Sequence, residues 1–555
     1  MLTALRLGNF KAFAETQRMP IRPLTLIFGA NSAGKSSLIH GLLLARHAME
    51  TGELDVHRMA IGGDSVDLGG FRQYVHRRDV ERRVEWAAEI DVAGLKGRVA
   101  ELLAPVHRAS IALNVGVELD NQGEPLRDTK PTVMSYEVEA DGKSLLRMSL
   151  RPGGNLQLDR LEHEHQIFRK VFKAIVQTAT TTESLTAADF EGLNEAIADI
   201  VPEIATRVEK FIPTDLLKTE KLFGAGEQSM LFPVSRGRRK EDLAAAVRFF
   251  LPRTLDALMQ DLGNTVRAEL SCLRYLGPLR SYPPRHVAFV PHHDPNWDAG
   301  GGYAWDIIKR DASVRERINE WLSDKDRLQT PYVFKVKSLF TADETEKYLS
   351  AFLQTIAREE PIVDGDRDSG PTVTGLARYI MEDPDELAQM IGDSLKDIAG
   401  LPDPVLWDMK TETEVSHRDV GIGISQVLPV LVSAFGLDRK ILAIEQPEIH
   451  LHPKLQAELG DVFIESALGE RKNTFIIETH SEHLILRLMR RMRDTYQENL
   501  PDGLPPVRPE DVAILFVQPK DSSAVVRLLE LDEEGQLLDP WPGGFFEEGF
   551  RERFS

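Results

Sequence analysis

A short glycine-rich segment near the start of the chain combines the residue types that can hold phosphate groups. Residues 29–36 read GANSAGKS and fit the spacing GxxxxGK[ST]. The apolar run 23–28 predicts a buried strand before them, and residues 35–49 predict a helix with one apolar side after them. Glycines let the backbone wrap closely around phosphates, and successive N–H groups at a helix N-terminus supply partial positive charge. The segment therefore predicts a nucleotide site.

Two residues at the end of this loop supply the charge and the oxygen that phosphate chemistry needs. Lys35 would reach the β- and γ-phosphates, and the Ser36 hydroxyl would ligate Mg²⁺. An ordinary Gly/Ser turn is the structural alternative, and the strand and helix around the loop favour the nucleotide site. We expect ATP and Mg²⁺ as cofactors. The loop residues expected at the nucleotide are Gly29, Asn31, Ser32, Ala33, Gly34, Lys35, Ser36 and Ser37.

The second half of the predicted site comes late in the chain. Residues 440–445 form an apolar run that ends in Glu445, where a Walker B acid would hold Mg²⁺. Residues 474–481 give another buried strand followed by His480, whose neutral imidazole can hydrogen-bond a γ-phosphate. Each segment alone is a weak signal. Together, in this order behind the loop, they indicate one nucleotide site.

The composition is ordinary for a globular protein. The chain has 555 residues, of which 42% are hydrophobic and 28% charged, so it has room for two or more structural units. No apolar stretch approaches the roughly 20 residues that cross a membrane. The N-terminus lacks the layout of a secretion signal, so we expect a cytoplasmic protein without membrane contact. The single cysteine, Cys272, excludes an internal disulfide and a cysteine-based zinc site.

The net charge of −20, from 67 basic and 87 acidic residues, argues against coating nucleic acid through global charge. A local basic surface stays open. The arginine run of Arg487, Arg490, Arg491 and Arg493 fits either a solvated helix face or a DNA-contacting stripe. The cluster 236–240 fits either a disordered loop or a DNA contact. Arg280 and Arg285 either reach the nucleotide or pair with the acidic surface.

Several motifs together resemble one group of ATPases. They are NFK at 9–11, GANSAGKSS at 29–37, DVGIGISQVLP at 419–429, EQPEIHLHP at 445–453 and ETHSEHL at 478–484. This set resembles the ABC-type heads of the RecF, SMC and OLD (overcoming-lysogenization-defect) group of AAA-family ATPases. The WPGGFF tail at 541–546 looks like the end of a small uncharacterised domain found behind such heads. The resemblance covers about 1–80 and 400–555, and more loosely YLGPLR at 275–280.

The resemblance implies an α/β fold, an ABC-type P-loop NTPase head interrupted by a largely helical insertion. We expect the N-terminal part of the head at 1–100 and the insertion at 101–400, with short strands and then mostly helices. The C-terminal part of the head would follow at 401–500, with a small C-terminal domain at 501–555. No heptad pattern persists over several repeats, so we expect short arms and no long coiled coil.

The resemblance also implies a dimer. In such heads two chains hold two ATP molecules between them, and each γ-phosphate contacts the P-loop of one chain and the signature motif of the other. Gly423, Ser425 and Gln426 occupy the signature position, although the sequence of their segment differs from the common LSGGQ motif. A Ser-capped core helix is the structural alternative, and the position between P-loop and Walker B favours the signature. We expect a homodimer or a higher oligomer through the ATP sites.

A further departure concerns catalysis. The family places a Glu directly after the Walker B acid, where this chain has Gln446. Gln can orient water but cannot accept a proton, so we expect slow hydrolysis unless Glu448 serves as the base. The catalytic residues expected are Lys35, Glu445, Gln446, Glu448 and His480, with Ser36 and Glu445 as metal ligands. His450 and His452 are expected in a loop that crosses the dimer interface and not at a metal.

Two functional classes follow from the resemblance and stay open. The first is a slow ATPase that couples ATP-driven dimerisation to DNA-associated work, in genome maintenance or anti-phage defence. The second is a nucleotide-gated scaffold that holds or releases an effector encoded nearby, such as a nuclease or toxin, without binding DNA. An ATP-binding protein that barely hydrolyses is a third interpretation. The residues after Ser481 lack an acid cluster for a two-metal nuclease, so a partner chain would have to cut any DNA.

Overall fold

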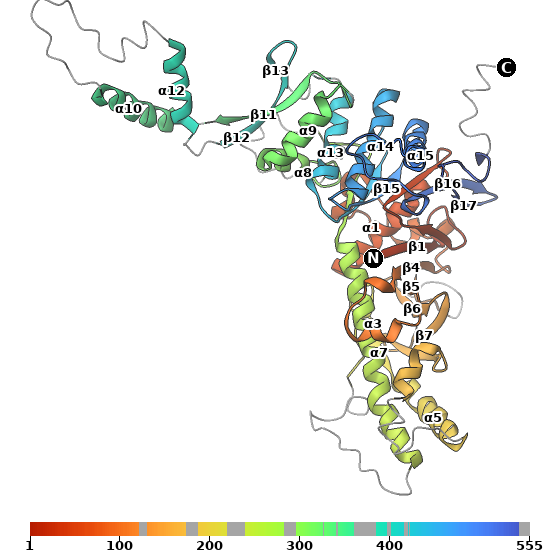
Figure 1. Cartoon of the computed structure of the whole chain (residues 1–555). Coiled ribbons are helices and arrows are strands. Elements are labelled where there is room, and N and C mark those ends of the chain that lie inside the picture. The colour runs from red at the N-terminus through yellow and green to blue at the C-terminus, as the bar shows by residue number, and fades with distance from the viewer. Residues whose placement is uncertain are drawn as a thin grey trace, which may run out of the picture. The chain divides into compact units, whose positions relative to one another are not determined.

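Two compact units make up the chain in the computed structural model. Unit 1 comprises residues 1–281, 293–304 and 422–555, and unit 2 comprises 282–292 and 305–421. The residues that the structure describes are 1–120, 130–173, 187–218, 239–281, 296–325, 327–339, 342–359, 384–396, 401–415, 420 and 422–542. Both units appear in Figure 1, and each is described by itself.

A six-stranded sheet carries the predicted nucleotide loop. Its strands, in spatial order, are β10 (Leu273–Leu276), β14 (Ile441–Glu445), β15 (Thr474–Glu478), β3 (Leu24–Gly29), β16 (Val512–Lys520) and β17 (Ser523–Leu529). The first five run parallel, and β17 pairs antiparallel with β16. Every residue of β3, β14 and β15 is buried, as their continuous apolar sequences predict. Because the carboxyl ends of parallel strands meet at one edge, the loops after β3, β14 and β15 share that edge.

Helices of unit 1 surround this sheet. They are α1 (Lys35–Thr51), α13 (Ile422–Gly436), α14 (Pro453–Leu468) and α15 (Glu482–Tyr496). The prediction of a strand, a loop and a helix around residues 29–36 is confirmed by β3 and α1. The predicted α/β P-loop NTPase fold is therefore confirmed. Pro429 lies inside α13, and Ser481 caps α15 by accepting a hydrogen bond from the Leu484 N–H at 3.1 Å.

An eight-stranded antiparallel sheet forms the other layer of unit 1. Its spatial order is β2 (Gln17–Pro20), β1 (Leu2–Gly8), β4 (Val84–Asp91), β5 (Arg108–Gly116), β6 (Thr132–Ala140), β7 (Lys143–Leu150), β8 (Asn155–Leu161) and β9 (Ala205–Arg207). The sheet continues across residue 100, so strands from the predicted insertion extend the predicted head. Short helical elements connect these strands: η1 (Ala60–Ser65), α2 (Phe71–Tyr74), η2 (His76–Arg78), η3 (Val92–Gly94), α3 (Gly97–Leu103), η4 (Gln166–Phe168) and η5 (Val201–Glu203).

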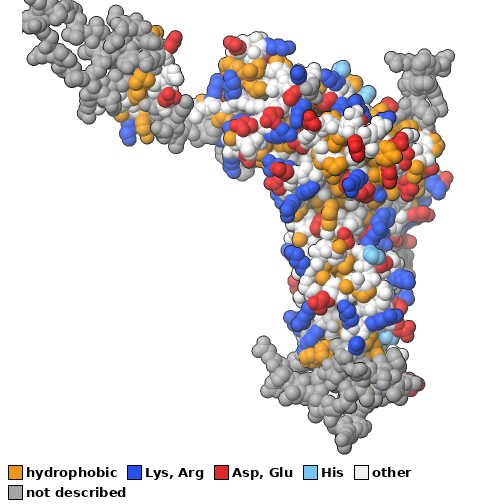
Figure 2. Space-filling model, in the orientation of Figure 1, with side chains coloured by type: hydrophobic (Ala, Val, Ile, Leu, Met, Phe, Trp, Pro, Cys, Tyr) orange, Lys and Arg blue, Asp and Glu red, His pale blue; other side chains and the backbone are white. Residues whose placement is uncertain are grey.

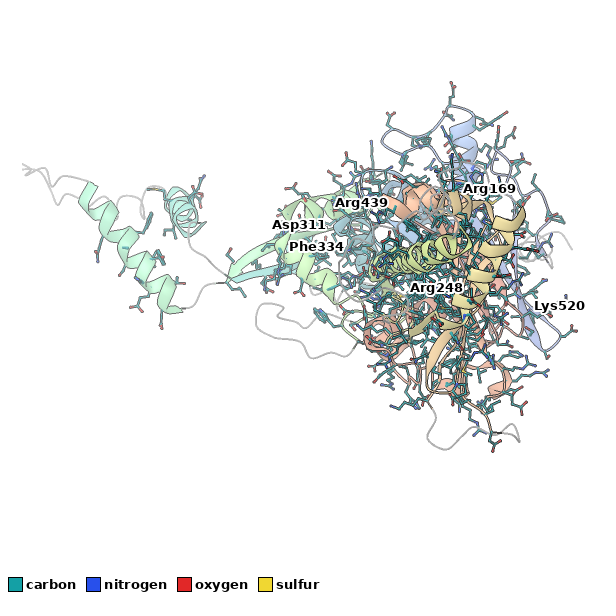
Figure 3. All side chains as sticks on the ribbon, turned by 90° about the horizontal axis from the view of Figure 1, so that it is seen from below. Arg169, Arg248, Asp311, Phe334, Arg439 and Lys520 are labelled. Atoms are coloured by element: carbon teal, nitrogen blue, oxygen red, sulfur yellow. The ribbon has the colours of Figure 1, made fainter. Side chains whose placement is uncertain are left out.

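A long helix lies along this antiparallel sheet. In Figure 1, α7 (Arg239–Ser271) runs beside β5, β6 and β7 and packs on α5 (Ala187–Ile200). Buried side chains of α7 belong to the same apolar cluster as those of the sheet. Arg169 and Arg248 appear at this end of unit 1 in Figure 3. The cluster 236–240 contributes only the first residues of α7, and its residues 236–238 and the side chains of 239 and 240 lie outside the described part.

Unit 2 contains helices and a small sheet. Its elements are α8 (Tyr303–Arg310, which begins in unit 1), α9 (Ala312–Ser323), β11 (Tyr332–Leu339), α10 (Ala342–Glu359), α12 (Pro384–Lys396), β12 (Leu401–Asp408) and β13 (Thr413–Val415). Asp311 caps α9 through its Oδ1, which accepts the Val314 N–H at 3.1 Å. The side chain of Asn319 exchanges two hydrogen bonds with the main chain of Phe334 (2.9 and 2.7 Å), which fixes α9 to β11. Asp311 and Phe334 are labelled in Figure 3.

The C-terminal segment contributes strands to the core sheet. Strand β16 follows η6 (Pro509–Asp511) and pairs with the P-loop strand β3. Ala14 N–H donates to Ser523 Oγ at 2.8 Å, and Ala524 N–H donates to the Ala12 carbonyl at 2.8 Å. Lys520 marks the tip of this hairpin in Figure 3. Residues 512–529 therefore lie in the same sheet as the nucleotide loop.

Two features of the described surface bear on partners. None of the described helices has both the length and the apolar character needed to cross a bilayer. On the face shown in Figure 2, basic and acidic side chains are intermingled over unit 1. Of the WPGGFF tail, Trp541 packs edge-on to Phe28 with ring centroids 5.9 Å apart, and residues 543–546 lie outside the described part.

Candidate functional site

Two glycines of the P-loop occupy positions that no other residue fits. Gly29 has φ 144°, and a Cβ there would lie 2.1 Å from the carbonyl oxygen of Val517. Gly34 has φ 98°, and a Cβ there would lie 2.5 Å from Cβ of Ala12. Close packing on both sides and left-handed backbone angles therefore require glycine at these two ends of the loop.

The lysine of the loop lies inside it. Lys35 is buried, and its Nζ donates to the carbonyls of Gly29 (3.2 Å) and Ala30 (2.9 Å). Burial lowers the pKa of the Lys35 ammonium, while the charges of Glu478 and Glu448 raise it. The remaining predicted loop residues differ in exposure: Asn31 and Ser32 are exposed, Ser36 is half-buried, and Ala33 and Ser37 are buried.

Two carboxylates meet at the sheet edge beside the loop. Glu445 ends β14 and Glu478 ends β15, and the two are direct partners in the parallel register. Glu445 Oε1 accepts a hydrogen bond from Tyr275 Oη at 3.0 Å and lies 3.5 Å from Nε2 of His40 on α1. Glu478 interacts with the Ser36 hydroxyl. The carboxylates of Glu445 and Glu478, the Ser36 hydroxyl and the Lys35 ammonium therefore lie at the same edge of the sheet.

Glu478 was not among the site residues that the sequence predicted. Burial and the neighbouring negative charge of Glu445 raise the pKa of its carboxyl to about 7, against the opposing effects of Ser36 and Lys35. Its Oε2 is buried without a hydrogen-bond partner among the described residues. One signal in the sequence was available: Glu478 ends a buried apolar strand in the same way as Glu445 does.

These residues fit a magnesium ion shared with a nucleotide. Carboxylate and hydroxyl oxygens are the donors that Mg²⁺ prefers, and the unpartnered Oε2 of Glu478 leaves one oxygen for it. Within the described part of the chain, no three His, Cys, Asp or Glu side chains form a complete metal cage. A site with few protein ligands suits Mg²⁺, which usually keeps water and phosphate oxygens in its shell.

The residues after Glu445 form a tight turn. Gln446 has φ 47°, is half-buried, and its N–H donates to the carbonyl of Glu478 at 2.7 Å. Glu448 is buried, and its Oε1 accepts the N–H of His480 at 2.7 Å. Burial raises the pKa of Glu448 and lowers that of His480, which Lys35 lowers further. The neutral imidazole expected at His480 is therefore favoured.

Two half-buried polar side chains, Lys11 and His40, and an open pocket lie next to the loop. Lys11 Nζ lies 2.7 Å from His40 Nδ1, and burial lowers the pKa of Lys11 to about 8. Lys11 also borders a pocket of about 630 Å³. The lining of this pocket consists of Lys11, Asp67, Leu68, Gly69, Gln73, Val75, Arg77 and Arg78. Because Ala12 contacts Gly34, the pocket lies next to the P-loop.

The predicted signature residues lie at the start of α13. The helix begins at Ile422, so Ser425 lies inside its first turn and does not cap the helix as the structural alternative required. Ser425 and Gln426 are buried within unit 1. Gly423 is half-buried, and a Cβ there would lie 2.7 Å from the carbonyl oxygen of His450. Gly421 lies outside the described residues. Of the three predicted residues, Gly423 is the most exposed.

The arginine run of α15 is largely internal. Arg487 pairs with Asp461 (2.6 Å) and Glu458 (2.9 Å) of α14. Arg491 pairs with the same Asp461 (2.7 Å) and with Asp494 (2.8 Å). Both guanidinium groups join α15 to its own unit. The two predictions, a DNA-contacting stripe and a solvated helix face, are therefore both wrong for Arg487 and Arg491. Arg490 and Arg493 are exposed.

His450 and His452 differ in their surroundings. His450 is exposed with φ 63°, in the turn before α14. His452 caps α14, because its Nδ1 accepts the Lys454 N–H at 3.3 Å. The cap gives His452 a structural role at this helix end.

Comparison with known proteins adds to this geometry. Residues 309–485 match the AAA ATPase domain family. The match includes the Walker B strand, Gln446, Glu448 and His480, and it starts after the P-loop. Residues 507–552 match a protein family of unknown function, DUF3696. No curated protein matches the chain.

Three solved structures align along most of the chain at low similarity. One is an SMC head bound to the C-winged helix domain of ScpA, with 11% identity, a TM-score of 0.34, and coverage of 96% of this chain and 98% of that one. The SMC head domain from Thermotoga maritima has 9% identity, a TM-score of 0.32, and coverage of 96% and 99%. The third is an SMC head with an extended coiled coil, bound to the C-terminal domain of ScpA derived from Pyrococcus furiosus. It has 11% identity, a TM-score of 0.32, and coverage of 95% of this chain and 96% of that one.

Proposed function

We propose that this chain is an ABC-type ATPase of the SMC, RecF and OLD group that binds ATP with Mg²⁺ and hydrolyses it slowly. One observation carries the proposal: the fold brings Lys35 and Ser36 of the P-loop to the edge where Glu445 and Glu478 end neighbouring parallel strands. The AAA ATPase domain match over residues 309–485 supports it.

The chain's own residues divide the work of binding. The N–H groups of the loop and the start of α1 surround the phosphates, and Lys35 exchanges its acceptors Gly29 and Ala30 for phosphate oxygens. Ser36, Glu445 and Glu478 would hold Mg²⁺, and the ion would supply positive charge beside the β- and γ-phosphates. The pocket beside Lys11 takes the nucleoside end of ATP.

Slow turnover follows from the turn after Glu445. Gln446 orients the attacking water through its amide but cannot remove a proton. Glu448 has one carboxylate oxygen engaged by the His480 N–H, and its Oε2 has no hydrogen-bond partner among the described residues. Glu448 is therefore the remaining proton acceptor near the turn, and His480 monitors the γ-phosphate.

The ATP cycle would act through dimerisation. The half-buried Gly423 end of α13, and not the buried side chains of Ser425 and Gln426, would approach the partner's ATP. A helix N-terminus favours a phosphate there. We propose a homodimer or higher oligomer that couples this cycle to DNA-associated work, in genome maintenance or anti-phage defence.

A second candidate is a nucleotide-gated scaffold for an effector, without DNA. It is favoured by the ion pairs of Arg487 and Arg491, which remove two cations from the surface that a DNA contact would use. The net charge of −20 also favours a scaffold that does not bind DNA.

ATP turnover by the purified chain tests the proposal, with and without linear duplex DNA and with Lys35→Ala as the blank. Turnover that depends on Lys35 is expected, and its absence contradicts the ATPase proposal. A DNA-dependent rise that disappears with added salt supports DNA-associated work. Slow turnover that ignores DNA supports the scaffold, and ATP-dependent co-purification of an effector would then identify its cargo.

A further inference from the structure

Arg280 is a buried cation whose hydrogen bonds to the described residues all go to the main chain. It is 5% exposed, whereas its neighbour Leu279 is 72% exposed. Its Nη1 donates to the carbonyl of Gln426 at 3.1 Å, and its Nη2 donates to the carbonyls of Glu445 and Gln446, both at 3.2 Å. Arg280 therefore does not form a pair on the acidic surface, while its contact with the nucleotide stays a prediction. It links the first turns of α13 to the end of β14.

The carbonyls that accept hydrogen bonds from Arg280 lie beside two irregular parts of the backbone, one in α13 and one after β14. Pro429 in α13 has no N–H, so it cannot donate to the carbonyl of Ser425, and its ring distorts this turn of the helix. The carbonyl of Gln426 lies in the same turn and accepts from Arg280. Gln446 has φ 47°, which a non-glycine residue keeps only when its surroundings hold it.

The same segment also holds Glu445 by its side chain. Tyr275 donates its hydroxyl proton to Glu445 Oε1 at 3.0 Å. The strand of Tyr275, β10, pairs with β14, with Leu276 opposite Ile444. Gly301 fits between Leu276 and Pro429: a Cβ at Gly301 would lie 2.9 Å from Cδ1 of Leu276 and 2.5 Å from Cβ of Pro429. Residues 275–280 thus contact Glu445 through both its carboxylate and its carbonyl.

We propose that Arg280 is a positioning residue that fixes the start of α13 to the turn of Glu445 and Gln446, so that displacement of one moves the other. Its effect on hydrolysis rests on the proposed function. Unit 1 stops at Ser281 before the chain first enters unit 2, and it resumes for the last time at Ile422. Arg280 and its acceptor Gln426 therefore lie near the first and the last of the four places where the chain passes from one unit to the other, and a shift of the chain at either place would reach the turn of Glu445 and Gln446 through one guanidinium.

The guanidinium suits this task better than an ammonium. Burial lowers the pKa of Arg280 to about 10, and the charge of Glu448 opposes the shift, so the group stays charged at neutral pH. Its planar fork reaches carbonyls on two elements at once, which the single ammonium of a lysine cannot do.

Hydrogen–deuterium exchange of the nucleotide-free full chain tests the link without using ATP. In Arg280→Gln, the amides of residues 422–430 and 446–451 should exchange at least about tenfold faster. These amides include Ile449, which donates to the Gln446 carbonyl at 3.2 Å, and Leu451, which donates to the Glu448 carbonyl at 3.0 Å. Arg490→Gln, which removes an exposed arginine away from this link, should leave both segments unchanged. Unchanged exchange in Arg280→Gln overturns the proposal.

Turnover kinetics then separate positioning from binding. Arg280→Lys keeps a charge and is the variant to use if Arg280→Gln does not fold. It should lower kcat about tenfold and change the Kd for ATP less than threefold, whereas Lys35→Ala should lose ATP binding. An unchanged kcat, or an equal loss of kcat and affinity, contradicts the positioning role. If the wild-type chain does not turn over ATP, the proposed function fails, while the exchange experiment still decides whether Arg280 links the two elements.

Discussion

Glu445 and Glu478 are register partners at the ends of two parallel strands, one in contact with His40 of α1 and the other with Ser36 of the P-loop. Burial raises the pKa of Glu478 to about 7, and repulsion from the neighbouring carboxylate of Glu445 adds to the shift. A divalent cation at this edge removes the repulsion. The pair therefore costs stability in the empty site and favours binding of Mg²⁺.

The first prediction concerns metal affinity. Glu478→Gln keeps the size of the side chain and removes one carboxylate from the proposed Mg²⁺ shell, so Mn²⁺ used as a probe should bind the ATP complex about tenfold more weakly. Electron paramagnetic resonance of free Mn²⁺ measures the affinity. Glu482→Gln, four residues further on in the first turn of α15, is the matched control and should bind Mn²⁺ like the wild type. Equal affinities in both variants would remove Glu478 from the site.

The second prediction is the pH dependence of stability. The pKa of Glu478 is about 7 in the folded chain against an ordinary value of 4.5, so the folded state keeps a proton that the unfolded state releases. Stability is thus greatest below pH 4.5 for this group and falls as the pH rises through 7, by about 3 kcal/mol in total. Urea unfolding of the nucleotide-free chain at pH 5.5 and 8 measures the loss. In Glu478→Gln the difference between the two pH values should shrink by most of that amount, and an undiminished difference contradicts the assignment.

The third prediction concerns the catalytic turn. Gln446→Glu supplies a carboxylate where the chain has an amide, and kcat should rise at least about tenfold because that carboxylate can accept the proton of the attacking water. Steady-state phosphate release measures kcat. The double variant Lys35→Ala, Gln446→Glu should be inactive, which ties any gain to the proposed site. If Gln446→Glu turns over at the wild-type rate, Gln446 is not what slows the enzyme.

The fourth prediction separates internal from exposed arginines of α15. Arg491→Met removes a buried partner of Asp461 and Asp494 and should destabilise unit 1 by about 3 kcal/mol. Arg490→Met removes an exposed charge that lies 3.7 Å from Asp494 and should change stability by less than about 1 kcal/mol. Calorimetric unfolding of both variants checks the contrast. Similar unfolding temperatures for the two variants would show that the α14–α15 network adds little.

The sequence was informative where chemistry and structure are local. Residues 29–36 carry the loop pattern, and the flanking apolar runs predict β3 and α1 because burial and periodicity act over a few residues. The strand that ends in Glu445 was predicted for the same reason, and the strand predicted to run to His480 ends two residues earlier, at Glu478. The α/β class and the strands and helix around the loop were thus determined by the sequence alone, and the nucleotide site that they position stays a prediction.

Partnerships between distant segments were decided only by the tertiary structure. Glu478 became a site residue because β15 lies beside β14 in register, and Arg491 became internal because α15 packs on α14. Arg280 lies 146 residues before its acceptor Gln426. An arginine carries the same charge whether water, DNA or a buried carbonyl surrounds it, and its neighbours depend on strand order and helix packing. Those are set by the balance of burial over the whole unit, which no short pattern contains.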